Sequence, residues 1–133
     1  ITFHIGLRQV ARFRNFWQAD LSTNFYPATS DDQLTRGGPL ARAPSARMVR
    51  LQVDSDSRRR HTFGLGTMYF WTTAGGHALA LTPSLTLNPG SSLQIALTPR
   101  LTFNHDPAQY VQTESDPTAA ATFGERYVFG KVW

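Results

Sequence analysis

Cysteine is absent from this 133-residue chain, and lysine occurs only once, at Lys131. Without cysteine there is no disulfide framework, no thiolate chemistry and no cysteine-based zinc site. No run approaches the ~20 apolar residues of a membrane-spanning helix. The four histidines lack the spacing of a metal-binding motif, and no motif sets a nucleophile beside a base. The sequence therefore predicts no metal ion, no cofactor and no enzymatic activity.

Charged residues are missing from a long central stretch. Between His61 and Pro99 the chain contains no Asp, Glu, Lys or Arg. A soluble sheet of this length normally carries charges on its solvent face, partly to block edge-to-edge pairing. Here Thr, Ser, Ala, Gly and Gln occupy most of those positions. This absence of charge favours a membrane environment over water.

The basic residues elsewhere do not suggest a nucleic-acid-binding surface. The chain has 13 basic and 9 acidic residues, a formal net charge of +4, and a basic balance often indicates a nucleic-acid partner. The arginines are nevertheless scattered, and their single run, Arg58-Arg59-Arg60, has no aromatic platform motif beside it. We therefore expect no nucleic-acid partner and interpret this run as a solvated or headgroup-contacting tip.

The sequence does contain an alternation of apolar and polar residues with a period of two. The three clearest runs read Phe63, Leu65, Thr67, Tyr69, Trp71; then Leu79, Leu81, Pro83, Leu85, Leu87; then Leu93, Ile95, Leu97, Pro99, Leu101, Phe103. A period of two indicates β-strands, because alternate side chains point to opposite faces. Weaker patterns at 3–7, 17–25, 51–53 and 123–133 bring the total to about seven strands, with no convincing helix.

Turn sequences between these strands predict hairpins with apolar residues opposite each other. Stretches 73–76 and 88–92 are rich in Gly, Asn and Pro, which favour turns. The predicted pairs are Trp71 with Leu79, Leu85 with Ile95, and Val53 with Phe63. The sequence therefore predicts an antiparallel up-and-down meander.

Two prolines interrupt the predicted strands. Pro83 and Pro99 occupy equivalent places in a motif, Leu-Thr-Pro-x-Leu-Thr, that occurs twice. Each proline removes a backbone donor from the ladder of sheet hydrogen bonds. We expect a bulge or an imperfectly paired stretch at these positions.

Loop lengths and aromatic residues are typical of a transmembrane β-barrel. Two long loops, at roughly 27–46 and 105–118, fall on one side of the meander, like the outer loops of such barrels. Aromatic residues gather near predicted strand ends, which resembles the girdles at the two membrane surfaces. These residues are Phe16-Trp17, Phe25-Tyr26, Tyr69-Phe70-Trp71, Tyr127 and Trp133.

We therefore interpret residues 1–133 as a single all-β segment of a barrel in the bacterial outer membrane. The leucine face would contact lipid and the polar face would line the interior, so that the segment acts as a membrane anchor, pore or transport channel. The alternative is a soluble β-sandwich or lipocalin-like barrel that turns the leucine face inward and binds a ligand such as a glycan.

The segment is expected to be a fragment of a larger barrel. It begins on Ile1-Thr-Phe-His-Ile5, which reads like the middle of a strand. Single-chain bacterial outer-membrane barrels have even strand numbers, whereas about seven strands are predicted here. Both edges of an open sheet in lipid would carry unpaired backbone groups. The expected partners are membrane lipid or detergent, and further β-strands from the rest of the chain or another copy.

Four short stretches resemble the C-terminal region of a bacterial family. They are Leu34-Thr-Arg-Gly-Gly-Pro-Leu40, Ser55-Asp-Ser-Arg58, Asp106-Pro-Ala-Gln-Tyr110 and Arg126-Tyr-Val-Phe129. Proteins of this family join an N-terminal domain like carbohydrate-binding family 9 to an outer-membrane barrel, and the likeness here is to the barrel. The resemblance implies further strands and no established activity. It assigns glycan binding to no residue of this chain.

Two sets of residues are candidate sites. Four charged residues fall on predicted interior faces and line the lumen, namely Asp20, Arg50, Arg100 and Arg126. They would either form a constriction that selects anionic solutes or brace the lumen as ion pairs. In the first long loop, Arg36 with Gly37 and Gly38 would present backbone N–H groups to an anion or sugar, or would plug the barrel mouth. Its Gly-Gly-Pro sequence predicts that the loop folds back against the barrel.

Overall fold

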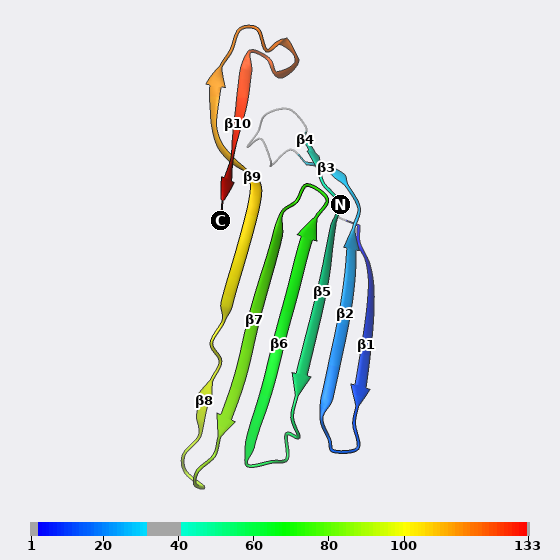
Figure 1. Ribbon diagram of the computed structural model, residues 1–133, viewed down its shortest axis with the longest axis vertical. Coiled ribbons are helices and arrows are strands. Elements are labelled where there is room, and N and C mark those ends of the chain that lie inside the picture. Colours follow the sequence, from blue (N-terminus) through cyan, green and yellow to red (C-terminus); the bar gives the residue numbers. More distant parts are fainter. Residues whose placement is uncertain (1–2, 32–40, 133) are drawn as a thin grey trace.

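One antiparallel sheet dominates the protein. The computed structural model describes residues 3–31 and 41–132. Seven strands follow one another in the order β1-β2-β5-β6-β7-β9-β10 (Figure 1). Their bounds are Ile5–Arg12, Gln18–Tyr26, Ala46–Asp54, His61–Thr72, His77–Leu87, Leu101–Ser115 and Glu125–Val132. The predicted all-β meander of about seven strands is confirmed.

Four short elements complete the described chain. β8 (Ile95–Leu97) pairs with β7, and β3 (Thr29–Asp31) pairs with β4 (Ala41–Ala43) in a separate two-stranded ribbon. A 3-10 turn, η1, covers Ala120–Thr122 between β9 and β10. No helix within 3–31 or 41–132 is long and apolar enough to cross a membrane.

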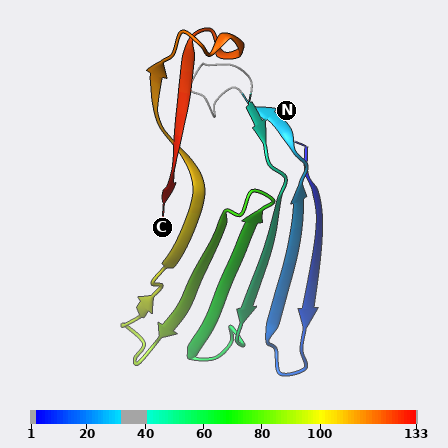
Figure 2. The same ribbon diagram turned by 45° about the horizontal axis from the view of Figure 1, so that its top comes forward.

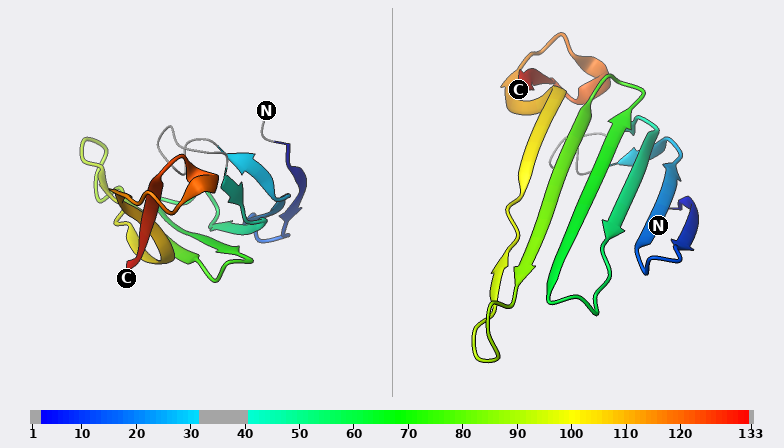
Figure 3. Two further views of the ribbon diagram at one scale, coloured as in Figure 1. Left: turned by 90° about the horizontal axis from the view of Figure 1, so that it is seen from above. Right: turned by 60° about the horizontal axis from the view of Figure 1, so that its bottom comes forward.

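The sheet is a single curved layer. β1 and β10 lie at opposite ends of the strand order, so the described residues form an open sheet and no closed barrel. Seen along its strands, the sheet bends into a trough (Figure 3, left), and the β9–β10 hairpin continues beyond the end of the β6–β7 hairpin (Figure 2). We call the end with the β1–β2, β5–β6 and β7–β8 turns the turn end, and the opposite end the hairpin end.

The predicted hairpins form, but each register is displaced by two residues. The observed pairs are Trp71 with His77, Leu85 with Leu97, and Val53 with Leu65. A displacement of one residue would have moved every apolar side chain to the other face, whereas a displacement of two keeps each on its own. The faces were therefore predicted correctly, and the partners were not.

The boundaries of the two long loops differ from the prediction. Residues 105–115 belong to β9, whose part from 106 to 115 pairs with β10, so the connection runs only from 116 to 124. This half of β9 carries polar residues on both faces, so it lacks the alternation that marks a strand. In the other loop, β3 and β4 form a ribbon. Arg36, Gly37 and Gly38, and the prediction that their loop folds back, lie outside the described residues.

The two proline motifs pair with each other. Leu81 lies opposite Leu101, and Leu85 lies opposite Leu97. Continuing this register places Pro83 opposite Pro99, and residues 98–100 between β8 and β9 are not part of a strand. Neither proline can donate a hydrogen bond across this gap. The predicted imperfectly paired stretch is confirmed.

Replacing both prolines should close the gap. In the variant Pro83→Thr/Pro99→Thr, each new residue has a backbone N–H, so β8 and β9 should join into one strand along β7. We expect amide hydrogen exchange at 97–101 to become slower. Pro89→Thr, in the β7–β8 turn, is the matched control and should leave that exchange unchanged. Equal exchange in the double variant and the wild type would contradict this explanation of the gap.

Candidate functional site

The sheet has no hydrophobic core of its own. Among the described residues only Ala46, Asp56 and Ala80 are buried, and no large apolar side chain is. Large apolar residues are instead exposed along the sheet, for example Leu65 at 46%, Leu101 at 52% and Phe103 at 60%. A soluble β-protein covers such a face with a second layer.

Most of the exposed apolar side chains lie on one side of the sheet, which we call the outer face. Strand pairing arranges this side in mostly apolar rows of exposed and half-buried residues, of which the clearest are Leu21, Leu51, Thr67, Leu81, Leu101 and Thr23, Val49, Tyr69, Leu79, Phe103. The residues predicted to face lipid, Leu81, Leu85, Ile95, Leu97 and Leu101, all belong to this surface, and none packs in a closed core. The apolar alternation thus lies on one side of the sheet, as predicted.

The opposite side, which we call the trough, carries many small and uncharged polar side chains together with several charged ones, such as Arg8, Asp20 and Arg50, and a few large apolar ones, such as Met68 and Phe70. In β6 the trough residues Thr62, Gly64 and Gly66 are half-buried, whereas Phe63 and Leu65 on the outer face are exposed. A Cβ at Gly66 would lie 2.7 Å from Oε1 of Gln52, and one at Gly64 would lie 2.6 Å from Oδ1 of Asp54. The trough is therefore the more crowded, concave side, and glycine permits that crowding.

Two of the four predicted lumen residues are engaged in ion pairs. Arg8 of β1 donates from Nε to Asp20 of β2 at 2.9 Å. Arg126 of β10 pairs with Asp116, just beyond the end of β9. The first pair braces two neighbouring strands in the trough, and the second braces the β9–β10 hairpin. For these two residues the ion pairs correspond to bracing, one of the two roles that the sequence allowed.

The other two predicted residues, Arg50 and Arg100, line one groove in the trough. Gln52, Gly66, Ala80 and Thr82 line the same groove. Neither arginine has an ion-pair partner within 4.0 Å in the part of the chain that the structure describes. The structure therefore separates the four predicted residues into two braced charges and two unpaired cations that share a groove.

The arginine run at the turn end is anchored rather than merely solvated. Arg58 donates from Nε and from its terminal nitrogen to the buried carboxylate of Asp56, both at 2.9 Å. Its guanidinium lies 3.2 Å from the ring centroid of Phe16 in the β1–β2 turn. Phe16 has a left-handed φ of 63°, which is uncommon for a bulky residue. All three arginines nevertheless remain exposed, Arg58 at 60% and Arg59 at 79% of the side chain, as expected for a solvated tip.

Arg60 extends this anchor to a third turn. It donates to the backbone carbonyls of Asn88 at 2.6 Å and Pro89 at 2.9 Å, and the Asn88 side chain donates back to the carbonyl of Arg60. The β1–β2, β5–β6 and β7–β8 turns are thus tied together at one end of the sheet. Sequence reasoning missed these contacts, because their partners are remote in sequence: Phe16 and Arg58 are 42 residues apart, and Arg60 and Asn88 are 28 apart.

The Arg58 contact lowers the pKa of Asp56. Its largest cause is the side-chain hydrogen bonding from Arg58, which holds the pKa at about 2, although burial acts in the opposite direction. Backbone N–H of Arg58 also donates to the carboxylate, at 3.0 Å. Asp56 therefore stays ionised over the whole physiological range.

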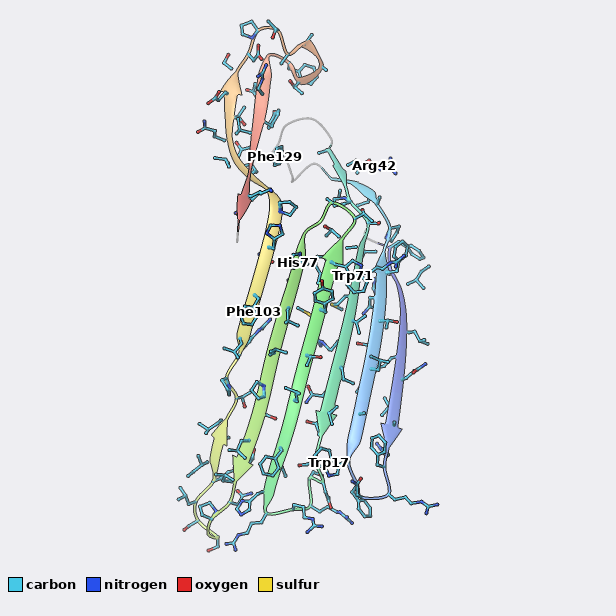
Figure 4. The ribbon with its side chains drawn as sticks, viewed as in Figure 1. Trp17, Arg42, Trp71, His77, Phe103 and Phe129 are labelled. Atoms are coloured by element: carbon cyan, nitrogen blue, oxygen red, sulfur yellow. The ribbon has the colours of Figure 1, made fainter. Side chains whose placement is uncertain are left out.

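A second hollow lies at the hairpin end. Arg42, Phe70, His77, His105 and Phe129 contribute to its lining, from five different strands. Figure 4 labels Arg42, His77 and Phe129 in this region. The rings of His77 and His105 are 5.0 Å apart. Among the described residues no three side chains are grouped as metal ligands.

Comparisons with known proteins leave the family of this chain open. No protein-family model, no curated protein and no solved structure matches it. The resemblance of the four short stretches therefore stays an expectation. Three of them fall in the turn from 55 to 58, in β9 and in β10, and the stretch 34–40 lies outside the described residues.

We expect the Asp56 carboxyl to titrate near pH 2 in carbon-13 NMR of the detergent-solubilised protein. Arg58→Gln should raise the pKa toward the ordinary value of 3.8, whereas Arg59→Gln, which removes a contact of 3.7 Å, should raise it less. Because folding lowers this pKa, the contact stabilises the turn above about pH 4, and its contribution is lost as the pH falls through about 2. An unchanged Asp56 pKa in Arg58→Gln would refute the assignment.

Proposed function

We propose that this chain is a segment of a bacterial outer-membrane β-barrel that serves as a membrane anchor, pore or transport channel. The observation that carries the proposal is the inverted arrangement of the sheet: its outer face is apolar and exposed, and its concave face is polar. Proteins that fold in water bury the apolar side. A barrel in a bilayer presents it to lipid and keeps the polar side around its interior.

The energetic argument concerns the uncovered outer face. Full burial of a Leu or Phe side chain stabilises a protein by roughly 1.5–3 kcal/mol relative to exposure. Leu65, Leu101 and Phe103 are each about half exposed, and many other large apolar side chains are exposed as well. Such a surface requires a cover, and hydrocarbon chains provide one without any second layer of protein.

The spacing of aromatic residues supports a membrane-sized band. Trp17 lies near the turn end and Trp71 near the hairpin end (Figure 4). Trp17 and Phe25 mark the two ends of β2, and Phe63 and Trp71 mark those of β6. Each pair is separated by eight residues, about 26 Å at 3.3 Å per residue. The apolar band of outer-membrane barrels is about 25 Å tall and has aromatic girdles at both borders.

The open edges of the sheet call for further strands. β1 pairs with β2 on one side only, and β10 pairs only with β9. Each unpaired backbone group in lipid costs on the order of several kcal/mol. Strands from another part of the protein, or from another copy, would satisfy these groups and close the barrel. The resemblance to the barrel region of the bacterial family supports the same arrangement, and the proposal includes no catalytic role.

Site-directed labelling should reveal an alternation along β7 and β9. Because the chain has no cysteine, single cysteines can be introduced at Leu81 and Leu101 on the outer face and at Thr82 and Thr102 in the trough. In vesicles, spin labels at the leucine positions should be more accessible to oxygen, and labels at the threonine positions to a water-soluble nickel reagent. The opposite pattern would favour the soluble sandwich or lipocalin-like barrel.

A charge should be costly on one face and tolerated on the other. Leu81→Arg places a cation in the lipid-facing band, where arginine costs about 2–4 kcal/mol near the bilayer midplane. Thr82→Arg, the matched control, directs the same side chain into the trough. We expect only Leu81→Arg to lower the free energy of unfolding in lipid by this amount, measured by urea titration. Equal losses in the two variants would contradict a lipid-facing outer face.

A further inference from the structure

The groove between Arg50 and Arg100 has the features of an anion site. The nearest carboxylates of the trough are otherwise engaged: Asp20 accepts from Arg8, and Asp54 accepts from the Gln52 side chain at 2.8 Å. Within the described residues, no ion pair within 4.0 Å neutralises Arg50 or Arg100. A guanidinium stays charged at every physiological pH. The two cations therefore raise the positive potential of one place in the trough.

Strand pairing explains why the two arginines share this groove. Arg50 projects from β5, and Arg100 lies beside β7, at the start of β9. Between them, β6 and β7 contribute Gly66, Met68, Ala80 and Thr82 to the groove, and of these only Met68, opposite Arg50, is large. Three strand spacings separate β5 from β9, about 14 Å across the sheet. Small side chains on the intervening strands leave the space above them open to a ligand.

Other groups in the groove suit an oxyanion as well. The hydroxyl of Thr82 can donate to an oxygen atom, whereas the Gln52 amide nitrogen already donates to Asp54. Each guanidinium has a planar fork of N–H donors that matches two oxygens of a phosphate or carboxylate. The groove therefore has one cation on each side and the Thr82 hydroxyl between them.

We propose that Arg50 and Arg100 together bind a small, multiply charged oxyanion, a phosphate-bearing solute, within the trough. The inference rests on the proposed function in one respect: in a closed barrel this groove would line the lumen and favour the passage of such anions. Binding itself requires only the trough. The two steps can therefore be tested separately.

The first experiment measures binding of inorganic tripolyphosphate to the full chain in detergent by isothermal titration calorimetry at low salt. Arg50→Gln/Arg100→Gln should weaken binding by about tenfold or more, because each lost contact is a hydrogen bond to a charged group. The control Arg59→Gln removes an exposed arginine from the turn end and should change affinity less than about twofold. Arg50→Lys/Arg100→Lys keeps both charges and should recover part of the affinity.

A variant between the arginines provides an independent check. Gly66→Asp places a carboxylate on the floor of the groove, where it should compete with the ligand and weaken binding as strongly as the double glutamine variant. If neither change affects affinity, or if the wild-type chain does not bind tripolyphosphate, the site does not exist.

A second experiment separates the site from the membrane function. Planar-bilayer recordings of the full chain across a potassium chloride gradient should give an anion-selective reversal potential, and the double glutamine variant should shift it toward cation selectivity. A chain that stays soluble without detergent, yet loses tripolyphosphate binding in the double variant, would overturn the membrane function and retain the site. A chain that inserts into bilayers with a reversal potential unaffected by the double variant would overturn the site and retain the membrane function.

Discussion

Backbone hydrogen bonding between neighbouring strands holds this sheet together, because the described residues contain no side-chain core that could do so. Pairing is continuous from β1 through β2, β5, β6 and β7 to β9. Its one interruption lies where Pro83 and Pro99 oppose each other, and there the loss of two donors separates β8 from β9. In water such a layer would lack the apolar burial that normally offsets the conformational entropy of folding. The composition of the two faces follows from this constraint: the layer depends on its surroundings for the burial that it does not provide itself.

Different contacts stabilise the two ends of the sheet. At the turn end, Asp56, Arg58 and Phe16 connect two turns, and Arg60 with Asn88 connects a third. These contacts lie beyond the strands, where charged and polar groups remain hydrated, so they can restrain the spacing of hairpins without placing charge on the outer face. At the hairpin end, the β9–β10 hairpin extends past the other strands and is braced by Arg126 with Asp116 (Figure 1). Charge is thus concentrated at the ends and in the trough, and the middle of the outer face is free of it.

Strand periodicity allowed the faces of the sheet to be predicted, but it carried no information on turn geometry. Gly75 turns with a left-handed φ of 92°, which closes the β6–β7 hairpin one residue earlier than the predicted centre and displaces the register by two. The half of β9 that pairs with β10 was not predicted as a strand, because polar residues lie on both of its faces. Its pairing with β10 also includes bulges. The arginine turn was missed because Phe16 and Asn88 are remote in sequence from Arg58 and Arg60. Of the candidate site, the four charged residues were found, whereas their pairing was not, since local sequence does not show that Arg8 faces Asp20.

The arginines of this sheet have two different roles, and the role of each depends on whether a carboxylate lies beside it. Arg8, Arg58 and Arg126 each meet a carboxylate, so the charge of each is largely cancelled and the contact acts as a brace. Arg50 and Arg100 meet none among the described residues, yet they line one groove together with Gly66, Met68, Ala80 and Thr82. A pair of cations that only stabilised the fold would gain from an acid within ion-pair distance, and neither arginine has one in the part of the chain that the structure describes. Leaving two exposed like charges beside one groove has a small cost through their mutual repulsion, which salt screens at a separation of about 14 Å. That cost is offset when an anion occupies the groove, which is why the arrangement favours binding over bracing at this place in the trough.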